Sequence, residues 1–165
     1  MLKRSFLVVL IAAGAAPLAA QAACTDPAGP GVVWQRCMIG ERSLVNVDLS
    51  GANLRDARLG RADLSDSNLT KADARRAKFF TATLRRVRFD EARLVEADFT
   101  KADLTGASFK GADLRRARLF RAILRDADFT GARMKGADLL NADLTGATWT
   151  DGKHICKEGS IGQCK

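Results

Sequence analysis

The chain has 165 residues, the size of one ordinary domain, and it carries 27 Lys and Arg against 19 Asp and Glu. It contains a single His and no Tyr, so two of the side chains most used in acid–base catalysis are scarce or missing. The formal net charge of +8 favours partners that are anionic, or at least not cationic.

The first 22 residues have the pattern of a secretory signal peptide. A basic start at residues 3–4 precedes an apolar run at residues 6–16, which is too short to span a bilayer. Residues 20–22 read Ala-Gln-Ala, the small-x-small pattern of a cleavage site. We predict cleavage after Ala22 and a periplasmic or secreted mature protein of the Gram-negative type.

Two alternatives concern this leader. Lipidation of Cys24 requires a lipobox, but Gln21 stands where that motif usually has Leu. An uncleaved membrane anchor conflicts with the short apolar run. No later segment approaches the length of a membrane span, so we expect no transmembrane segment after cleavage.

An uninterrupted five-residue period follows. From Leu44 to Trp149, 22 positions spaced five apart hold fourteen Leu, five Phe, one Ala, one Met and one Trp. The position two residues earlier is Ala eighteen times. A period of five fits neither an α-helix nor a half-buried strand, whereas a chain that turns a corner every five residues keeps all large residues inside a coil.

The repeat, in which Ala is followed by Asp or Asn, by Leu or Phe and by two variable residues, resembles the pentapeptide-repeat family, and residues 42–150 match it throughout. The resemblance implies an all-β fold, a right-handed quadrilateral β-helix with four pentapeptides per coil and about five and a half coils. It leaves an N-terminal cap at 23–41 and a C-terminal cap at 151–165. The end segment also resembles the tail of exported pentapeptide proteins from Gram-negative bacteria.

Residues twenty apart should stack if four pentapeptides form one coil. One such column holds only Leu, from Leu44 to Leu144, and a second changes from Leu to Phe and ends at Trp149. Outward charges alternate in sign at the same spacing, as in Lys78, Asp98 and Arg118, which avoids like charges on adjacent strands. Ala74 is the weak core position, which we expect Phe79 to fill unless a bulge or small cavity remains.

Four cysteines, Cys24, Cys37, Cys156 and Cys164, lie outside the repeats, and three pairings are open to them. If the solenoid separates its ends, only Cys24–Cys37 and Cys156–Cys164 can reach each other. A zinc site that uses His154 is a less favoured alternative. Since both ends then carry cysteine loops, we expect a monomer.

No arrangement of side chains in the sequence predicts catalysis, a cofactor or a metal. His154 lies in the C-terminal cap without the partners of a triad. The recurring Asp residues belong to the repeat and are expected to be solvated strand positions beside Arg neighbours. We therefore expect a protein that is not an enzyme.

One side of the rod is the candidate binding face. Outward apolar residues interrupt its polar surface, and basic residues flank them. The members are Phe80, Phe120, Leu140, Arg58, Arg61, Lys78, Lys101, Arg118 and Arg121. An equally open interpretation is that Arg side-chain stems cover the rings and no partner binds.

These features predict a scaffold or binding protein of the cell envelope, whose partner is a protein or another anionic envelope component. A purely structural rod is the alternative. The resemblance also raises a DNA-mimicking topoisomerase binder, but that role needs an acidic rod in the cytoplasm. Nucleic acid fits the charge and not the compartment, so we do not expect it as a partner.

Overall fold

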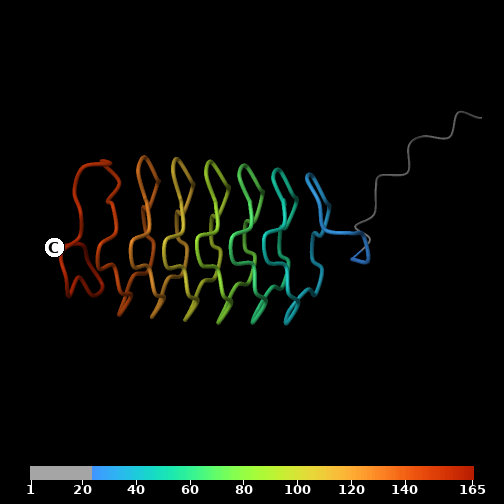
Figure 1. The fold of residues 1–165 in the computed structure, drawn as a ribbon, viewed down its shortest axis with the longest axis horizontal. Helices are drawn as coiled ribbons and strands as arrows, with labels where there is room; N and C mark the ends of the chain where they lie inside the picture. Colours follow the sequence, from blue (N-terminus) through green and yellow to red (C-terminus); the bar gives the residue numbers. More distant parts are fainter. Residues whose placement is uncertain (1–23) are drawn as a thin grey trace, which may run out of the picture.

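The computed structural model describes residues 24–165, which form a rod of stacked coils (Figure 1). The predicted signal peptide and its cleavage site fall outside the described residues. Residues 24–165 contain no helix and no extended strand; single-residue parallel bridges join the coils instead. Each parallel bridge links residues twenty apart, from Val33–Asn53 to Asp128–Thr148, which confirms the predicted stacking period. In this part of the chain no helix is long and apolar enough to cross a membrane.

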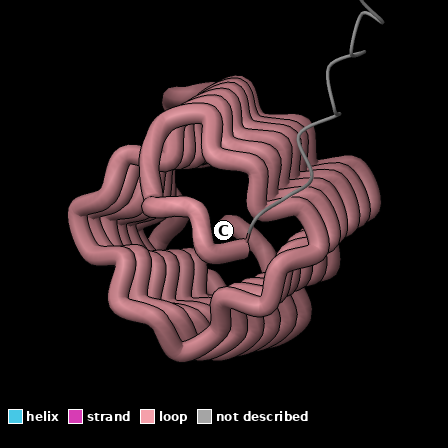
Figure 2. Tube along the Cα trace, turned by 90° about the vertical axis from the view of Figure 1, so that its right-hand side faces the viewer, coloured by secondary structure: helices cyan, strands magenta, loops and turns pink. Residues whose placement is uncertain are grey.

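Each corner of the coil is a β-turn with a left-handed residue. Viewed along the rod, the corners form four lobes around the axis (Figure 2). From Trp34 to Leu144, the residue two after each core centre has positive φ, as in Asp56 at 57° and Arg76 at 57°. At most corners the carbonyl of the centre accepts a hydrogen bond from the amide three residues on, as Leu54 does from Ala57 at 3.0 Å. This is the backbone of a turn that requires φ > 0 at its third residue.

The Asp and Asn residues of the repeat stabilise these turns. Asp103 accepts a hydrogen bond through Oδ1 from the backbone amide of Thr105 at 3.1 Å, and Asn68 does the same for Thr70 at 3.1 Å. A short carboxylate or amide side chain reaches its own backbone two residues on, which longer side chains cannot do. These residues therefore have a structural task beyond the solvated role expected of them.

The core consists of the Leu, Phe and Ala columns. The aromatic column is continuous, with Phe89 stacked on Phe109 at 5.3 Å between ring centroids and Phe109 on Phe129 at 5.1 Å. Ala74 is fully buried, and its amide donates to the carbonyl of Arg93 at 2.9 Å. Because the ladder passes through Ala74 unbroken, this position is not a bulge.

The coil starts earlier than the sequence pattern indicated. Parallel bridges begin at Val33, inside the segment expected to be the N-terminal cap. Trp34 and Ile39 occupy core centres and are buried, and Cys37 takes the small inward position. The repeat was hidden because none of these pentapeptides has the Ala and Asp or Asn that mark the others. These two added sides lengthen the expected five and a half coils by about half a coil.

Both expected disulfides are present, Cys24–Cys37 and Cys156–Cys164. They exclude the zinc alternative, and a lipid on Cys24 would need the thiol that the disulfide uses. The C-terminal cap closes two of the four sides of the last coil, through antiparallel bridges of Asp143 with Ile161 and Thr148 with Ile155.

The other two sides of the last coil remain open. Within residues 24–165, Arg133 and Asp138 bridge to the preceding coil but to no later segment, and Met134 and Leu139 are only partly buried. One end of the rod is therefore half covered, which weakens the argument for a monomer. The monomer stays a prediction.

Candidate binding site: a cationic trough

The predicted binding face is one side of the rod, between two corners. Its middle row carries Arg58, Lys78, Asp98 and Arg118, joined by parallel bridges. Because every bridge advances one coil, these side chains follow one another at about 4.8 Å. The left-handed corner residues 56, 76, 96 and 116 form one border of this row.

Arg58, Lys78 and Arg118 of the middle row enclose, with this border, a groove of about 460 Å³, which we call the cationic trough. Its cations are Arg58, Arg76, Lys78, Arg116 and Arg118, and its carboxylates are Asp56 and Glu96. The lining has a net charge of +3. A groove lined by one dominant sign concentrates counter-ions of the opposite sign, so the trough is suited to an anionic group.

Ion pairs hold part of this lining in place. Arg76 contacts Asp56 through Nε at 2.8 Å, and Arg116 contacts Glu96 at 3.2 Å. The hydrogen bond from Arg76 lowers the pKa of Asp56, so this carboxylate stays ionised at neutral pH.

The middle row is less neutralised than its border. Lys78 lies 3.9 Å from Asp98. Among the described residues, Arg58 and Arg118 form no salt bridge, and they are the cations of the trough that are free for a ligand.

The apolar residues of the predicted face lie on the opposite border. Phe80 is 40% exposed and its ring lies over Gly60, where an added Cβ would come within 2.4 Å of the ring. Phe120 is partly buried, and the Arg121 guanidinium lies 5.2 Å from its ring centroid. Leu140 is 60% exposed, at the open end of the rod. An Arg side chain thus lies over the Phe120 ring, whereas the Phe80 ring rests on Gly60 and stays exposed, so both interpretations of this face remain predictions.

The structure separates the predicted residues into two groups. Arg58, Lys78 and Arg118 line the trough. The others lie at the opposite corner, where Arg61 pairs with Glu41 at 2.9 Å and Lys101 is exposed. The predicted face is therefore two borders with a charged row between them.

The face predicted from the sequence leaves out the border residues Arg76, Arg116, Asp56 and Glu96, because they lie at a corner and not on the side itself. A corner residue points along the diagonal and contributes to both sides that meet there. The signal was available, because these four alternate in sign at the twenty-residue spacing.

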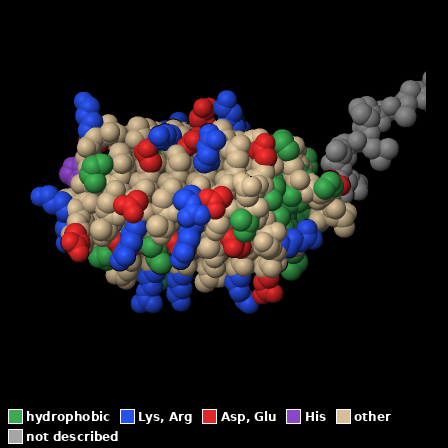
Figure 3. Space-filling model, in the orientation of Figure 1, with side chains coloured by type: hydrophobic (Ala, Val, Ile, Leu, Met, Phe, Trp, Pro, Cys, Tyr) green, Lys and Arg blue, Asp and Glu red, His purple; other side chains and the backbone are tan. Residues whose placement is uncertain are grey.

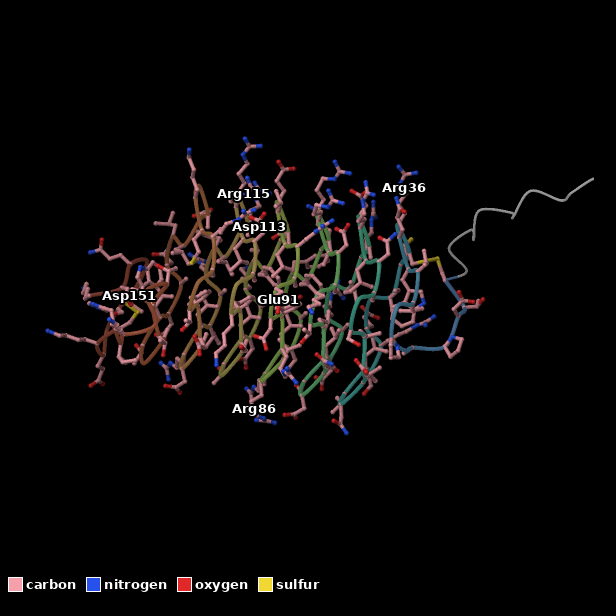
Figure 4. The ribbon with its side chains drawn as sticks, turned by 90° about the horizontal axis from the view of Figure 1, so that it is seen from above. Arg36, Arg86, Glu91, Asp113, Arg115 and Asp151 are labelled. Atoms are coloured by element: carbon pink, nitrogen blue, oxygen red, sulfur yellow. A yellow bond between two sulfur atoms is a disulfide. The ribbon has the colours of Figure 1, made fainter. Side chains whose placement is uncertain are left out.

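Basic side chains also dominate the outer part of the same corner. Arg115 and Arg36 project from one edge of the rod, and Arg86 projects from the opposite edge (Figure 4). Asp113 accepts hydrogen bonds from Arg115 at 2.7 Å and Arg133 at 2.5 Å, and these contacts lower its pKa well below the usual range. In the view of Figure 3, single Lys and Arg side chains alternate with Asp and Glu, so no broad acidic patch occupies that face.

The C-terminal His has an ordinary surface environment. His154 is exposed, and its Nε2 lies 3.3 Å from the carbonyl oxygen of Lys165. Residues 24–165 contain no group of three or more His, Cys, Asp or Glu arranged to hold a metal ion.

Coils of four five-residue sides, parallel bridges twenty residues apart and a core of stacked Leu and Phe define a four-sided β-solenoid. The sequence profile described as pentapeptide repeats matches residues 43–79, 82–119 and 122–148, in eight copies. The chain belongs to the pentapeptide-repeat family, and its fold is the right-handed β-helix of that family.

Solved structures agree with this assignment. HetL, a pentapeptide repeat protein involved in heterocyst differentiation regulation from the cyanobacterium Nostoc sp. strain PCC 7120, is 36% identical with a TM-score of 0.55. The match covers 75% of this chain and 62% of HetL, so the chain spans less than two thirds of that protein.

Two further structures are similar. The pentapeptide repeat protein Rfr23 from the cyanobacterium Cyanothece 51142 is 26% identical over 67% of this chain and 90% of Rfr23, with a TM-score of 0.54. QnrB1, a plasmid-mediated fluoroquinolone resistance protein, is 21% identical over 71% of this chain and 70% of QnrB1, with a TM-score of 0.51, and supports the fold alone. No curated protein matches the chain.

Proposed function

We propose that this chain is a non-enzymatic binding scaffold of the cell envelope that holds an anionic partner in the cationic trough. The observation that carries the proposal is the +3 lining, in which Arg58 and Arg118 have no salt-bridge partner among the described residues. The two disulfides fit an oxidising compartment, and the pattern of residues 1–22 fits export.

The rod offers such a partner a rigid surface. Backbone amides and carbonyls on the sides form hydrogen bonds between coils. The Leu59 amide donates to the Lys78 carbonyl at 2.7 Å, and the Arg58 amide donates to the Cys37 carbonyl at 2.8 Å. A partner on this side is therefore recognised through side chains and not by adding a strand. The basic chain does not have the acidic surface that a DNA mimic needs, so we do not propose that role.

Charge reversal inside the trough tests the proposal. Arg58→Glu/Arg118→Glu is compared with Lys153→Glu/Lys157→Glu, which changes the net charge equally at the exposed C-terminal cap. Retention of the mature protein on immobilised dextran sulfate is measured against salt concentration, because each ionic contact steepens the salt dependence. We expect the trough variant to elute at clearly lower salt than the cap variant. Equal elution of the two variants would refute the trough as the binding site.

A second pair of measurements tests the partner and the apolar border. In-cell crosslinking of the natural protein is compared with the trough variant and with Phe80→Ser/Phe120→Ser/Leu140→Ser. If the trough alone binds, capture is lost in the first variant and kept in the second. Loss of capture only in the second variant, with unchanged melting, would move the binding site to the apolar border.

A further inference from the structure

A second groove, of about 660 Å³, lies on a different corner of the rod and is larger than the cationic trough. We call it the notch. Its border residues Arg85, Thr105 and Arg125 are twenty apart, and so are Asp103, Ile123 and Asp143 on the adjoining bridge row. These six residues form three pairs in a repeating pattern, and the middle pair, Thr105 and Ile123, is altered.

The repeating unit is an ion pair that spans two coils. Arg85 donates through Nε to Oδ2 of Asp103 at 2.6 Å, and Arg125 donates through Nε to Oδ2 of Asp143 at 2.5 Å. In both pairs the residues are eighteen apart in the chain. The notch lies where the pair between them is missing, because positions 105 and 123 carry Thr and Ile.

Small residues leave this gap open. Thr105 occupies the border position where the coils on either side have Arg, and Gly106 follows it at a corner where Arg86 stands one coil earlier. A Cβ on Gly106 would lie 3.3 Å from Cγ of Arg86, so the Arg86 side chain packs beside the glycine and lines the notch with it.

Ile123 forms an apolar floor. It is 41% exposed, whereas the other outward bridge positions on this side are Ser43, Asp63, Thr83, Asp103 and Asp143. Avoiding a stack of like charges explains why Asp is missing at 123, but Thr83 shows that a polar residue serves that purpose. An exposed Ile at the base of a groove has no such explanation.

The two Arg walls are fixed and still carry free donors. Burial raises the pKa of Asp103, but hydrogen bonds from Thr105 and Arg85 outweigh it and lower the pKa overall, so the carboxylate that anchors Arg85 stays charged. Burial likewise opposes the hydrogen bond from Arg125 to Asp143, and the net pKa of Asp143 is again lowered. Among residues 24–165, no hydrogen bond uses the terminal Nη groups of Arg85 or Arg125.

We infer that the notch binds a small aromatic carboxylate, whose ring lies on Ile123 between Arg85 and Arg125 and whose carboxylate accepts hydrogen bonds from the free guanidinium ends. The walls are two coil rises apart, about 10 Å, which leaves room for one planar group between them. Guanidinium groups stack on aromatic rings and bind carboxylates in a fork geometry. The volume is within the range of small-molecule sites.

Restoring the missing ion pair fills the notch. Thr105→Arg/Ile123→Asp places a guanidinium and a carboxylate at the spacing of the two natural pairs. Ser65→Arg/Thr83→Asp introduces the same Arg and Asp, eighteen residues apart, on the same side of the rod. These positions lie two coils before the notch, which stays open. The two double variants have equal net charge, and each sets its new Asp between two existing ones.

Benzoate is the probe, and the Gly106 amide signal in 1H–15N spectra of the mature protein is the readout, because it is present in every variant. We expect benzoate to cause saturable shifts in the natural protein. The affinity for benzoate should be at least tenfold lower in Thr105→Arg/Ile123→Asp and unchanged in Ser65→Arg/Thr83→Asp. Benzylamine tests the carboxylate and acetate tests the ring, and neither should saturate. The inference is overturned if either compound matches benzoate, or if the filled variant binds as the control does.

Discussion

Removal of one ring from the middle of the aromatic column tests whether the rod unfolds as a single unit. Phe109 is fully buried, stacks on Phe89 and Phe129, and meets Phe99 edge-on at 6.2 Å. Truncation of a buried Phe to Ala costs about 3–5 kcal/mol, and each aromatic pair contributes about 1 kcal/mol of specific interaction. We expect Phe109→Ala to cost about 4 kcal/mol and Phe109→Leu about 1–2 kcal/mol.

The loss is concentrated at the contacts between neighbouring coils, because a solenoid coil packs only against the next one. A cost of about 4 kcal/mol is a large part of the stability of a typical domain, about 5–15 kcal/mol. The coils that follow residue 109 should then unfold in a transition of their own, apart from that of the preceding coils.

The chain supplies its own reporters, since its two tryptophans, Trp34 and Trp149, lie near opposite ends of the repeats. Urea unfolding is followed by fluorescence in the Trp34→Phe and Trp149→Phe backgrounds, each with and without Phe109→Ala. Without the change at 109 the two transitions should coincide. With it, the Trp149 signal should change at lower urea than the Trp34 signal. Coincident transitions with a loss below about 1 kcal/mol would refute the reasoning.

Three other changes test the corners, the core and the charges. Thr81 is β-branched at φ 54°, so Thr81→Asn should raise the free energy of unfolding by about 0.5–1 kcal/mol, and an unchanged melting temperature would contradict this. Ala74→Leu should be tolerated or stabilising, whereas a melting temperature several degrees lower would show overpacking. The hydrogen bond from Arg115 lowers the pKa of Asp113, so its stabilisation is present above the unfolded pKa of about 3.9 and is lost as pH falls below it. Thermal melts from pH 7 to 2 should therefore decline less steeply for Asp113→Asn, and parallel curves would disprove the assignment.

The core could be predicted because it depends on one property, the size of every fifth residue. Leu64 and Leu84 carry that information without any knowledge of the surface, and the twenty-residue column followed from it. The same method failed at the start of the coil. Trp34 and Ile39 pack as well as Leu, but their pentapeptides lack the turn residues that make the repeat visible.

The surface was harder to predict, because long side chains choose among several partners. Asp73 and Arg93 have opposite charges at the twenty-residue spacing, yet Asp73 pairs with Arg75 within its own coil at 2.6 Å. Arg85 reaches Asp103, which is neither in its own column nor in its own coil. Which ion pair forms depends on the direction that side chains take next to a left-handed corner residue. The amino-acid sequence alone does not specify that direction.

The geometry of the coil makes the two proposed sites independent. The border residues Arg76 and Arg86 are ten residues apart, which is half a turn, so the trough and the notch lie at opposite corners, and Figure 4 shows Arg86 on the edge opposite Arg115. Changes at separated sites without shared contacts have additive effects on free energy. Arg58→Glu/Arg118→Glu should therefore leave benzoate binding at the notch unchanged, and Thr105→Arg/Ile123→Asp should leave dextran sulfate retention equal to that of its control. A variant at one corner that weakened binding at the other would mean that the rod transmits strain between its sides.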